Sequence, residues 1–203
     1  MLPPPIRETA DLIRRLPGIG PRQALRCAFY ILRRPQERED LKRALENISN
    51  IGNCEKCFRA ISITQNTAQR LCTSCHDPKR ANGTLCVVEE DTDLEQLEKA
   101  AVFKGQYFVL GGRLSIAYHP QSIRINELKQ RVSSDQNLKE IILALSPTSE
   151  GNAAALWLKQ AVIESASSSE NVKITRLGIG MPSGGEIEYA DEETLRGAMK
   201  NRN

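Results

Sequence analysis

Four cysteines in two Cys-x-x-Cys pairs constrain this chain of 203 residues more than any other feature. Cys54 and Cys57 form the first pair, Cys72 and Cys75 form the second, and 14 residues separate them. Two such pairs supply four thiolates for a tetrahedral metal ion, and the connecting segment is long enough to fold one pair against the other. Because four sulfur ligands leave no open coordination position, the pattern predicts a structural Zn²⁺ site, one per chain, in residues 54–78.

The first five residues, MLPPP, bear on how these cysteines are interpreted. They contain neither the charged region nor the apolar region of a secretory signal. No stretch of the chain approaches the roughly 20 apolar residues of a membrane helix. We therefore expect a cytoplasmic protein without a membrane partner, in which disulfides are disfavoured and paired cysteines bind metal.

Residues 72–76, with the sequence CTSCH, also match the attachment motif of c-type haem. Covalent haem binding is therefore an alternative to the zinc site. Haem attachment requires export and would leave the first cysteine pair without a function, so the zinc site is favoured. His76 is then a polar neighbour of the metal. Cys27 and Cys86 lie within apolar patterns and are expected in the hydrophobic core.

Residues 16–20, with the sequence LPGIG, join two segments whose apolar residues recur at helical spacing, 6–16 and 25–32. This arrangement is typical of a helix-hairpin-helix. Gly18 and Gly20 permit backbone angles that are closed to other residues, and their lack of a side chain lets a phosphate approach the main chain. Free amides and the helix dipole at the start of the second helix attract that phosphate.

Arg22 and Arg26 follow the hairpin one helical turn apart. Together with Gly18 and Gly20 they are the candidate DNA contacts, of a kind that positions the backbone of DNA without reading its bases. A plain helical hairpin with solvated arginines is the alternative.

The charge is distributed unevenly along the chain. Residues 1–83 contain 15 Lys and Arg against 8 Asp and Glu, a net charge of +7. Residues 84–203 contain 13 against 17, a net charge of −4. This asymmetry favours a polyanionic partner for the first part and a different role for the second.

After Gly83, apolar runs of β type alternate with amphipathic helical patterns. The expected strands are 84–88, 107–110, 140–145 and 172–177, and the expected helices are 91–101, 123–132, 153–165 and 192–200. Such alternation predicts the α/β class, with a parallel sheet covered on both faces. A third helix is expected before the cysteines, over 38–51, and Trp157 is expected in the core.

Acidic residues follow two of the expected strands. Glu89 comes directly after the strand 84–88, and Glu150 lies shortly after the strand 140–145. Carboxylates at the carboxyl ends of neighbouring parallel strands converge, and two or three of them can hold Mg²⁺ for phosphoryl chemistry. A solvated acidic rim is the alternative.

The motifs occur in the order and spacing of a known family. They are the hairpin, the four cysteines, CVVE at 86–89, YFVLGG at 107–112, Thr175-Arg176 and GMPSGGEIEYAD at 180–191. Over nearly its whole length the chain resembles the RecR family of bacterial recombination proteins, which have a helix-hairpin-helix, a four-cysteine zinc finger and a Toprim domain.

The resemblance implies a non-catalytic DNA-binding mediator of recombinational repair, associated with the nucleoid. Members form dimers or ring-like tetramers and act with RecO or RecF to help load the RecA recombinase onto gapped DNA. The family's basic hairpin residues fall on Arg22 and Arg26, and its acidic partner-binding region includes Glu89 and Glu150. Its C-terminal segment, 175–203 here, carries a Walker-B-like stretch and takes part in subunit exchange. The implied division is 1–53 for the hairpin module, 54–78 for the zinc finger, 79–174 for the Toprim domain and 175–203 for this segment.

The sequence departs from the catalytic members of the Toprim superfamily at one site. Catalytic Toprim domains carry Asp-x-Asp after the third strand, where this chain has Ser146-Pro147-Thr148. Neutral hydroxyls do not replace two carboxylates around Mg²⁺, so a Mg²⁺ cofactor is doubtful and strand cleavage is not expected. Many relatives also have His in place of Phe108, and the segment 115–122, which contains His119, is unlike theirs; neither change has an assigned role.

Two other functions stay open. A Mg²⁺-dependent nuclease or primase-like enzyme needs a further carboxylate near Glu89. A pure protein adaptor would bind its partner through the acidic half and have no DNA affinity of its own.

Overall fold

The computed structural model describes residues 2–63, 70–114, 123–163 and 172–202, which form two compact units, residues 1–51 and 52–203. The segment 115–122 with His119 lies outside the described residues, as does the serine-rich stretch at 165–169.

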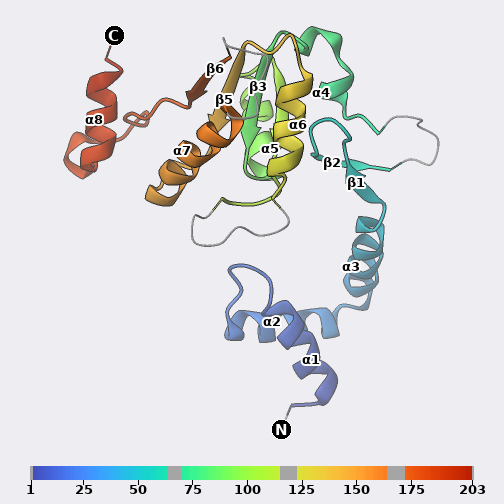
Figure 1. Cartoon of the computed structure of the whole chain (residues 1–203). Helices are drawn as coiled ribbons and strands as arrows, with labels where there is room; N and C mark the ends of the chain where they lie inside the picture. Colours follow the sequence, from blue (N-terminus) through green and yellow to red (C-terminus); the bar gives the residue numbers. More distant parts are fainter. Residues whose placement is uncertain (1, 64–69, 115–122, 164–171, 203) are drawn as a thin grey trace. The chain divides into compact units, whose positions relative to one another are not determined.

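Three helices make up the first unit: α1 (Pro4–Ile13), α2 (Pro21–Arg33) and α3 (Pro35–Ile48) (Figure 1). Each begins at a proline, whose fixed φ suits the first helical position and whose missing N–H is not needed there. The helices therefore start earlier than their apolar patterns predict. Helix α1 ends at Ile13, three residues before the predicted end, because the hairpin turn begins there. Ala24 and Ala28 of α2 are buried in this unit.

The cysteine-bearing segment opens the second unit with short elements that its polar sequence did not predict. Strands β1 (Ile51–Asn53) and β2 (Ala60–Ser62) form a two-stranded sheet. Helix α4 (Thr73–His76) and the 3-10 turn η1 (Pro78–Arg80) follow. We call residues 52–80 the cysteine module.

The main sheet contains β3 (Thr84–Val88), β4 (Gln106–Val109), β5 (Glu140–Ala144) and β6 (Lys173–Arg176). Its order is β4-β3-β5-β6, and all pairs are parallel. Val88 is in register with Val109 of β4 and with Ala144 of β5, so the carboxyl ends of these strands lie at one edge. The predicted parallel sheet is confirmed.

Helices cover both faces of this sheet. Residues of α6 (Ile125–Ser134) and α7 (Ser149–Ile163) pack on the face that presents Leu85 and Val87. Helix α5 (Asp91–Ala100) packs on the opposite face, against Cys86 and Val88. The alternation along β3 gives each face its own apolar cluster. The predicted α/β class is thus confirmed, with a helical module and a cysteine cluster before the sheet.

The chain ends in η2 (Ile187–Tyr189) and α8 (Glu192–Lys200), the second as predicted. Two core assignments are wrong. Trp157 is 39% exposed, because the side of α7 that packs in the core is formed by Ala154, Leu158 and Val162. Cys27 is only half-buried, whereas Cys86 is buried as expected. Burial raises the pKa of the Cys86 thiol to about 12, so this cysteine is an inert part of the core.

Candidate nucleic-acid interface and metal centre

The predicted hairpin connects α1 to α2 by a tight turn. The amide of Ile19 donates to the carbonyl of Leu16 at 3.3 Å, which closes the turn. Gly18 has φ +77°, a conformation that costs residues with a side chain roughly 1–2 kcal/mol. The prediction that glycine is needed for its backbone angles is therefore confirmed at Gly18.

At Gly20 that reasoning is wrong. Its φ is −80° and its ψ is 168°, an extended conformation that any residue adopts. A Cβ added there meets no described atom within 4 Å. Neither the backbone angles nor the packing at this position requires glycine, and the main chain is open to approach on this side.

Gly20 is also the N-cap of α2, and no side chain caps the amides of the first helical turn. Pro21 occupies the first helical position, and the amide of Ala24 already donates to the carbonyl of Gly20 at 2.9 Å. The amides of residues 22 and 23 therefore have no partner within the helix. They lie at the N-terminal end of α2, where the helix dipole is positive, and this arrangement binds anions.

Arg22 and Arg26 are both exposed, one turn apart on α2. Residues four apart lie on the same helix face, so both guanidinium groups lie on one side of the helix that begins at the hairpin. None of the ion pairs found among the described residues involves either arginine. Both charges are thus available to phosphate.

The four predicted ligands, Cys54, Cys57, Cys72 and Cys75, come together in the cysteine module. Their sulfur atoms all lie within 4.8 Å of one another, and all four residues are buried. Zn–S bonds of about 2.3 Å place tetrahedral sulfurs about 3.8 Å apart, so a small contraction brings all four onto one ion. In the part of the chain that the structure describes, this is the one group of three or more potential ligands that is close enough to share a metal.

Backbone amides already orient the sulfurs. The amide of Cys72 donates to Sγ of Cys54, and the amide of Cys75 donates to Sγ of Cys72, each at 3.4 Å. A hydrogen bond with the Cys57 thiol holds the pKa of Cys54 well below its usual range and raises the pKa of Cys57. Amide donors and a ready thiolate are what a metal–thiolate site requires.

The cysteine module is attached to the edge strand of the main sheet. The amide of Val109 in β4 donates to the carbonyl of Cys57 at 2.8 Å. Phe58, held at φ +63°, packs edge-to-face on Phe108 with 5.3 Å between ring centroids. Arg80 pairs with Glu98 of α5 at 2.7 Å. A backbone hydrogen bond, a ring contact and an ion pair thus hold the cysteine module against the sheet and α5.

At the carboxyl edge of the sheet, the two candidate acidic residues differ in exposure. Glu89 is only 3% exposed, and its Oε2 accepts from the hydroxyl of Ser146 at 2.9 Å and from the amide of Ser146 at 3.2 Å. Glu150, in the first turn of α7, is exposed. The residue that stands where catalytic relatives have an aspartate thus donates hydrogen bonds to Glu89, a role that the sequence did not suggest.

Two nearby carboxylates also have structural partners. Oδ1 of Asp91 accepts from the amide of Ala60 at 2.7 Å, and Oδ2 of Asp93 accepts from the amide of Glu90 at 2.9 Å in the capping box of α5. These hydrogen bonds connect α5 to the cysteine module and fix the start of the helix.

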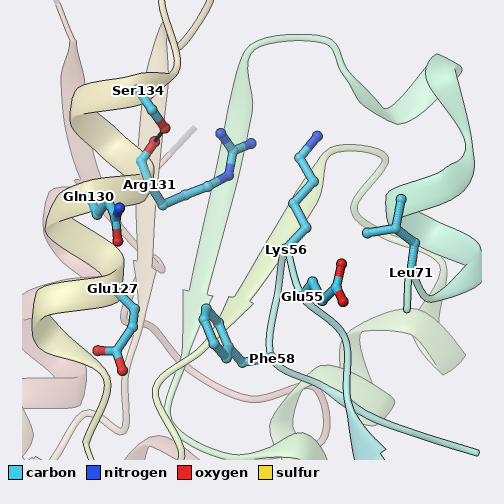
Figure 2. Close-up of a pocket in the computed structure, with 8 residues that line it drawn as sticks. All are labelled: Glu55, Lys56, Phe58, Leu71, Glu127, Gln130, Arg131 and Ser134. Atoms are coloured by element: carbon cyan, nitrogen blue, oxygen red, sulfur yellow. Dashed lines mark hydrogen bonds between the residues drawn. The ribbon is translucent and has the colours of Figure 1, made fainter. Parts of the chain in front are cut away.

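A cavity of about 470 Å³ lies between the cysteine module and α6 (Figure 2). Lys56 and Arg131 extend into it from the two sides, while Glu55 and Glu127 add two carboxylates. Arg131 is already paired with Asp135 at 2.8 Å. With balanced charges, this cavity does not favour a polyanion.

None of the described helices combines the length and the apolar composition needed to cross a bilayer.

Comparison with known proteins agrees with this architecture. Residues 6–49 match the helix-hairpin-helix model of RecR, residues 83–178 match the Toprim domain model, and residues 180–203 match the C-terminal model of RecR. Proteins named Recombination protein RecR are similar along their whole length. The one from Gloeothece citriformis is 38% identical over 100% of this chain and 97% of its own. Those from Gloeobacter violaceus and Trichormus variabilis are 40% and 42% identical, over 98% and 94% of this chain and 96% and 98% of theirs. The hairpin, the cysteine cluster, the parallel sheet and these similarities together establish that the chain belongs to the RecR family of recombination proteins.

Proposed function

We propose that the chain is a non-catalytic DNA-binding mediator of recombinational repair whose hairpin binds the phosphate backbone. The observation that carries the proposal is the start of α2, where no side chain caps the amides of the first turn and the surface around Gly20 is open. Two arginines that take part in none of the ion pairs among the described residues follow it. Each hairpin binds weakly, and self-association adds several of them into useful avidity.

The proposed division of labour follows the sequence prediction. Residues 1–53 bind DNA, 54–78 hold a structural Zn²⁺ through Cys54, Cys57, Cys72 and Cys75, 79–174 form the Toprim domain, and 175–203 take part in subunit exchange. Four thiolates are the ligand set of structural zinc sites.

Partners of two kinds are proposed. Exposed apolar side chains support self-association into a dimer or tetramer: Leu41, Leu45 and Ile48 follow one face of α3, and Tyr189 is 80% exposed near the C-terminus. RecO or RecF is the proposed mediator partner, with loading of RecA on gapped DNA as the outcome. Because Glu89 is buried, we assign any direct contact with such a partner to Glu150 and the role of positioning the strand ends to Glu89.

An absence of catalysis is proposed from the hydrogen bonds of Glu89. Ser146 donates two hydrogen bonds to Oε2 of Glu89, and hydroxyl side chains stand at 146 and 148, where catalytic Toprim domains carry two carboxylates. Mg²⁺-dependent cleavage of DNA that disappears in Glu89→Gln would establish the enzyme instead.

The two hairpin glycines provide a test of the backbone contact. Gly20→Ala is expected to lower DNA affinity about tenfold, which corresponds to about 1.4 kcal/mol, because the added Cβ meets no described atom of the protein and stands in the path of the phosphate. Its effect on the unfolding temperature is expected to be small and limited to the poorer helix cap that alanine makes. Gly18→Ala is expected to destabilise the hairpin by about 1 kcal/mol through its positive φ. Fluorescence anisotropy with labelled DNA and thermal unfolding measure the two effects.

Gly112→Ala is the matched control, since its Cβ has ordinary packing distance to Ile123 and it lies outside the hairpin and the C-terminal segment. Unchanged DNA affinity in Gly20→Ala contradicts close approach of phosphate to the main chain.

A further inference from the structure

A groove of about 450 Å³ runs along the second half of α2, beyond the hairpin. It lies within the first compact unit and is lined by Leu25, Arg26, Phe29, Tyr30, Arg33 and Arg34. Its lining differs from that of the cavity beside α6: it contains three guanidinium groups and two aromatic rings, and no carboxylate.

The guanidinium groups are not equivalent. Arg34 pairs with Glu37 at 2.7 Å, so its charge is compensated. Arg26 and Arg33 take part in none of the ion pairs seen among the described residues. The groove therefore keeps two net positive charges, which fit two successive phosphates of a nucleic acid.

Tyr30 forms an aromatic platform at the groove. Its side chain is 49% exposed, and the guanidinium of Arg34 lies over its ring at 4.5 Å from the centroid. A hydrogen bond to Glu37 raises the pKa of Tyr30, so the hydroxyl stays protonated. The Tyr30, Arg34 and Glu37 side chains thus order one another, and an ordered ring loses little entropy when a base stacks on it.

The groove continues the proposed phosphate-binding surface. Arg22, Arg26, Phe29 and Arg33 are spaced by four, three and four residues, a spacing that places them along one face of α2. With a rise of 1.5 Å per residue, Arg33 lies roughly 16 Å along the helix from Arg22. One DNA strand that contacts the hairpin can therefore follow the same face into the groove.

We propose that this groove binds unpaired nucleotides of single-stranded DNA, with a base stacked on Tyr30 and the flanking phosphates on Arg26 and Arg33. Bases in a duplex are stacked on one another and have no free face for an aromatic side chain, whereas unpaired bases do. The inference rests on the proposed function and deepens it, because it makes DNA with a single-stranded segment the preferred substrate.

The test compares Tyr30→Leu and Tyr30→Phe in the full-length protein. The probes are a labelled oligothymidine and a blunt duplex of the same length, measured by fluorescence anisotropy. Tyr30→Leu is expected to weaken binding of the oligothymidine about fivefold to a hundredfold, the range for loss of one stacked base. Binding of the duplex is expected to change less than twofold. Tyr30→Phe keeps the ring and is expected to retain most of the affinity for the oligothymidine.

Trp157→Leu, which removes an exposed aromatic ring from the other compact unit, is the matched control. Equal loss on both probes, or no loss on either, overturns the inference while duplex binding by the unmodified protein still supports the proposed function. If the unmodified protein binds neither probe, the proposed function itself fails. A change of oligomeric state in Tyr30→Leu, seen by light scattering without a change in the ratio of the two affinities, assigns the groove to a second copy of the chain and also overturns the inference.

Discussion

Replacing Arg22 and Arg26 together with alanine is expected to lower DNA affinity by about tenfold to a hundredfold, in keeping with the loss of two phosphate contacts. Both side chains are exposed and are in none of the ion pairs of the described residues, so their removal leaves the fold intact. The slope of log affinity against log salt concentration is expected to become shallower by about 2, because each phosphate contact releases close to one counterion.

The matched control for this variant is Lys42→Ala with Arg43→Ala. It changes the net charge of the chain by the same amount, from α3 of the same unit, and disturbs only the exposed pair of Arg43 with Asp40. Exposed pairs of this kind contribute little to stability. The hairpin account is wrong if both double variants lose the same affinity, since general attraction by charge would then explain the binding.

Loss of the metal is expected to have the largest effect on stability. Replacement of Cys72 and Cys75 by serine is expected to reduce the zinc content from one ion per chain to none and to lower the free energy of unfolding by several kcal/mol. Structural zinc sites supply apparent binding free energies of about 10–16 kcal/mol in isolated fingers, and that free energy is largely free energy of folding. Elemental analysis and thermal unfolding, with and without a chelator, measure the two quantities.

The destabilisation is expected to extend beyond the cysteine module. The Cys57 carbonyl satisfies the amide of Val109 on the edge strand β4, and Phe58 packs on the buried Phe108. Cys27→Ser is the control, because Cys27 lies outside the cluster and is only half-buried. If the unmodified protein unfolds at the same temperature with and without chelator, or at the same temperature as the Cys72 and Cys75 variant, a structural role for zinc is contradicted.

The sequence predicts the parts of the fold that depend on spacing and periodicity. The two cysteine pairs specify the ligand cluster, because no other arrangement of the chain uses all four thiols at one site. The alternation of short apolar runs with amphipathic segments specifies a parallel sheet, since only crossover helices connect such strands. The start of α8 follows from Asp191, whose side chain caps the helix by accepting from the amide of Thr194 at 2.8 Å.

Other features depend on three-dimensional context that spacing does not encode. Gly18 and Gly20 look equivalent in the sequence. Only the observed φ values show that Gly18 needs glycine for its backbone conformation, whereas Gly20 adopts angles that are open to any residue. Trp157 lies beside the buried side of α7, and its exposure depends on which side of the helix packs against the sheet. The apolar pattern alone does not specify that side. The donor role of Ser146 toward Glu89 requires that the ends of β3 and β5 lie side by side.

The groove on α2 had a signal that the sequence analysis did not use. Arg26, Phe29 and Arg33 recur at helical spacing behind the hairpin, so a helical projection places them on the face of Arg22. The contact of Arg34 with the ring of Tyr30 could not be predicted from spacing. It depends on the rotamers of the two side chains, and these are set by their shared partner Glu37.

Binding of the DNA backbone by the hairpin is tested by the affinity of the unmodified protein for two gapped duplexes of unrelated sequence across a salt series. Affinity is expected to fall steeply with salt and to be the same for both sequences, because the contacts are to phosphate. Affinity that is flat in salt or confined to one sequence contradicts it. Negligible binding at every salt concentration contradicts it as well and assigns the chain to protein adaptors.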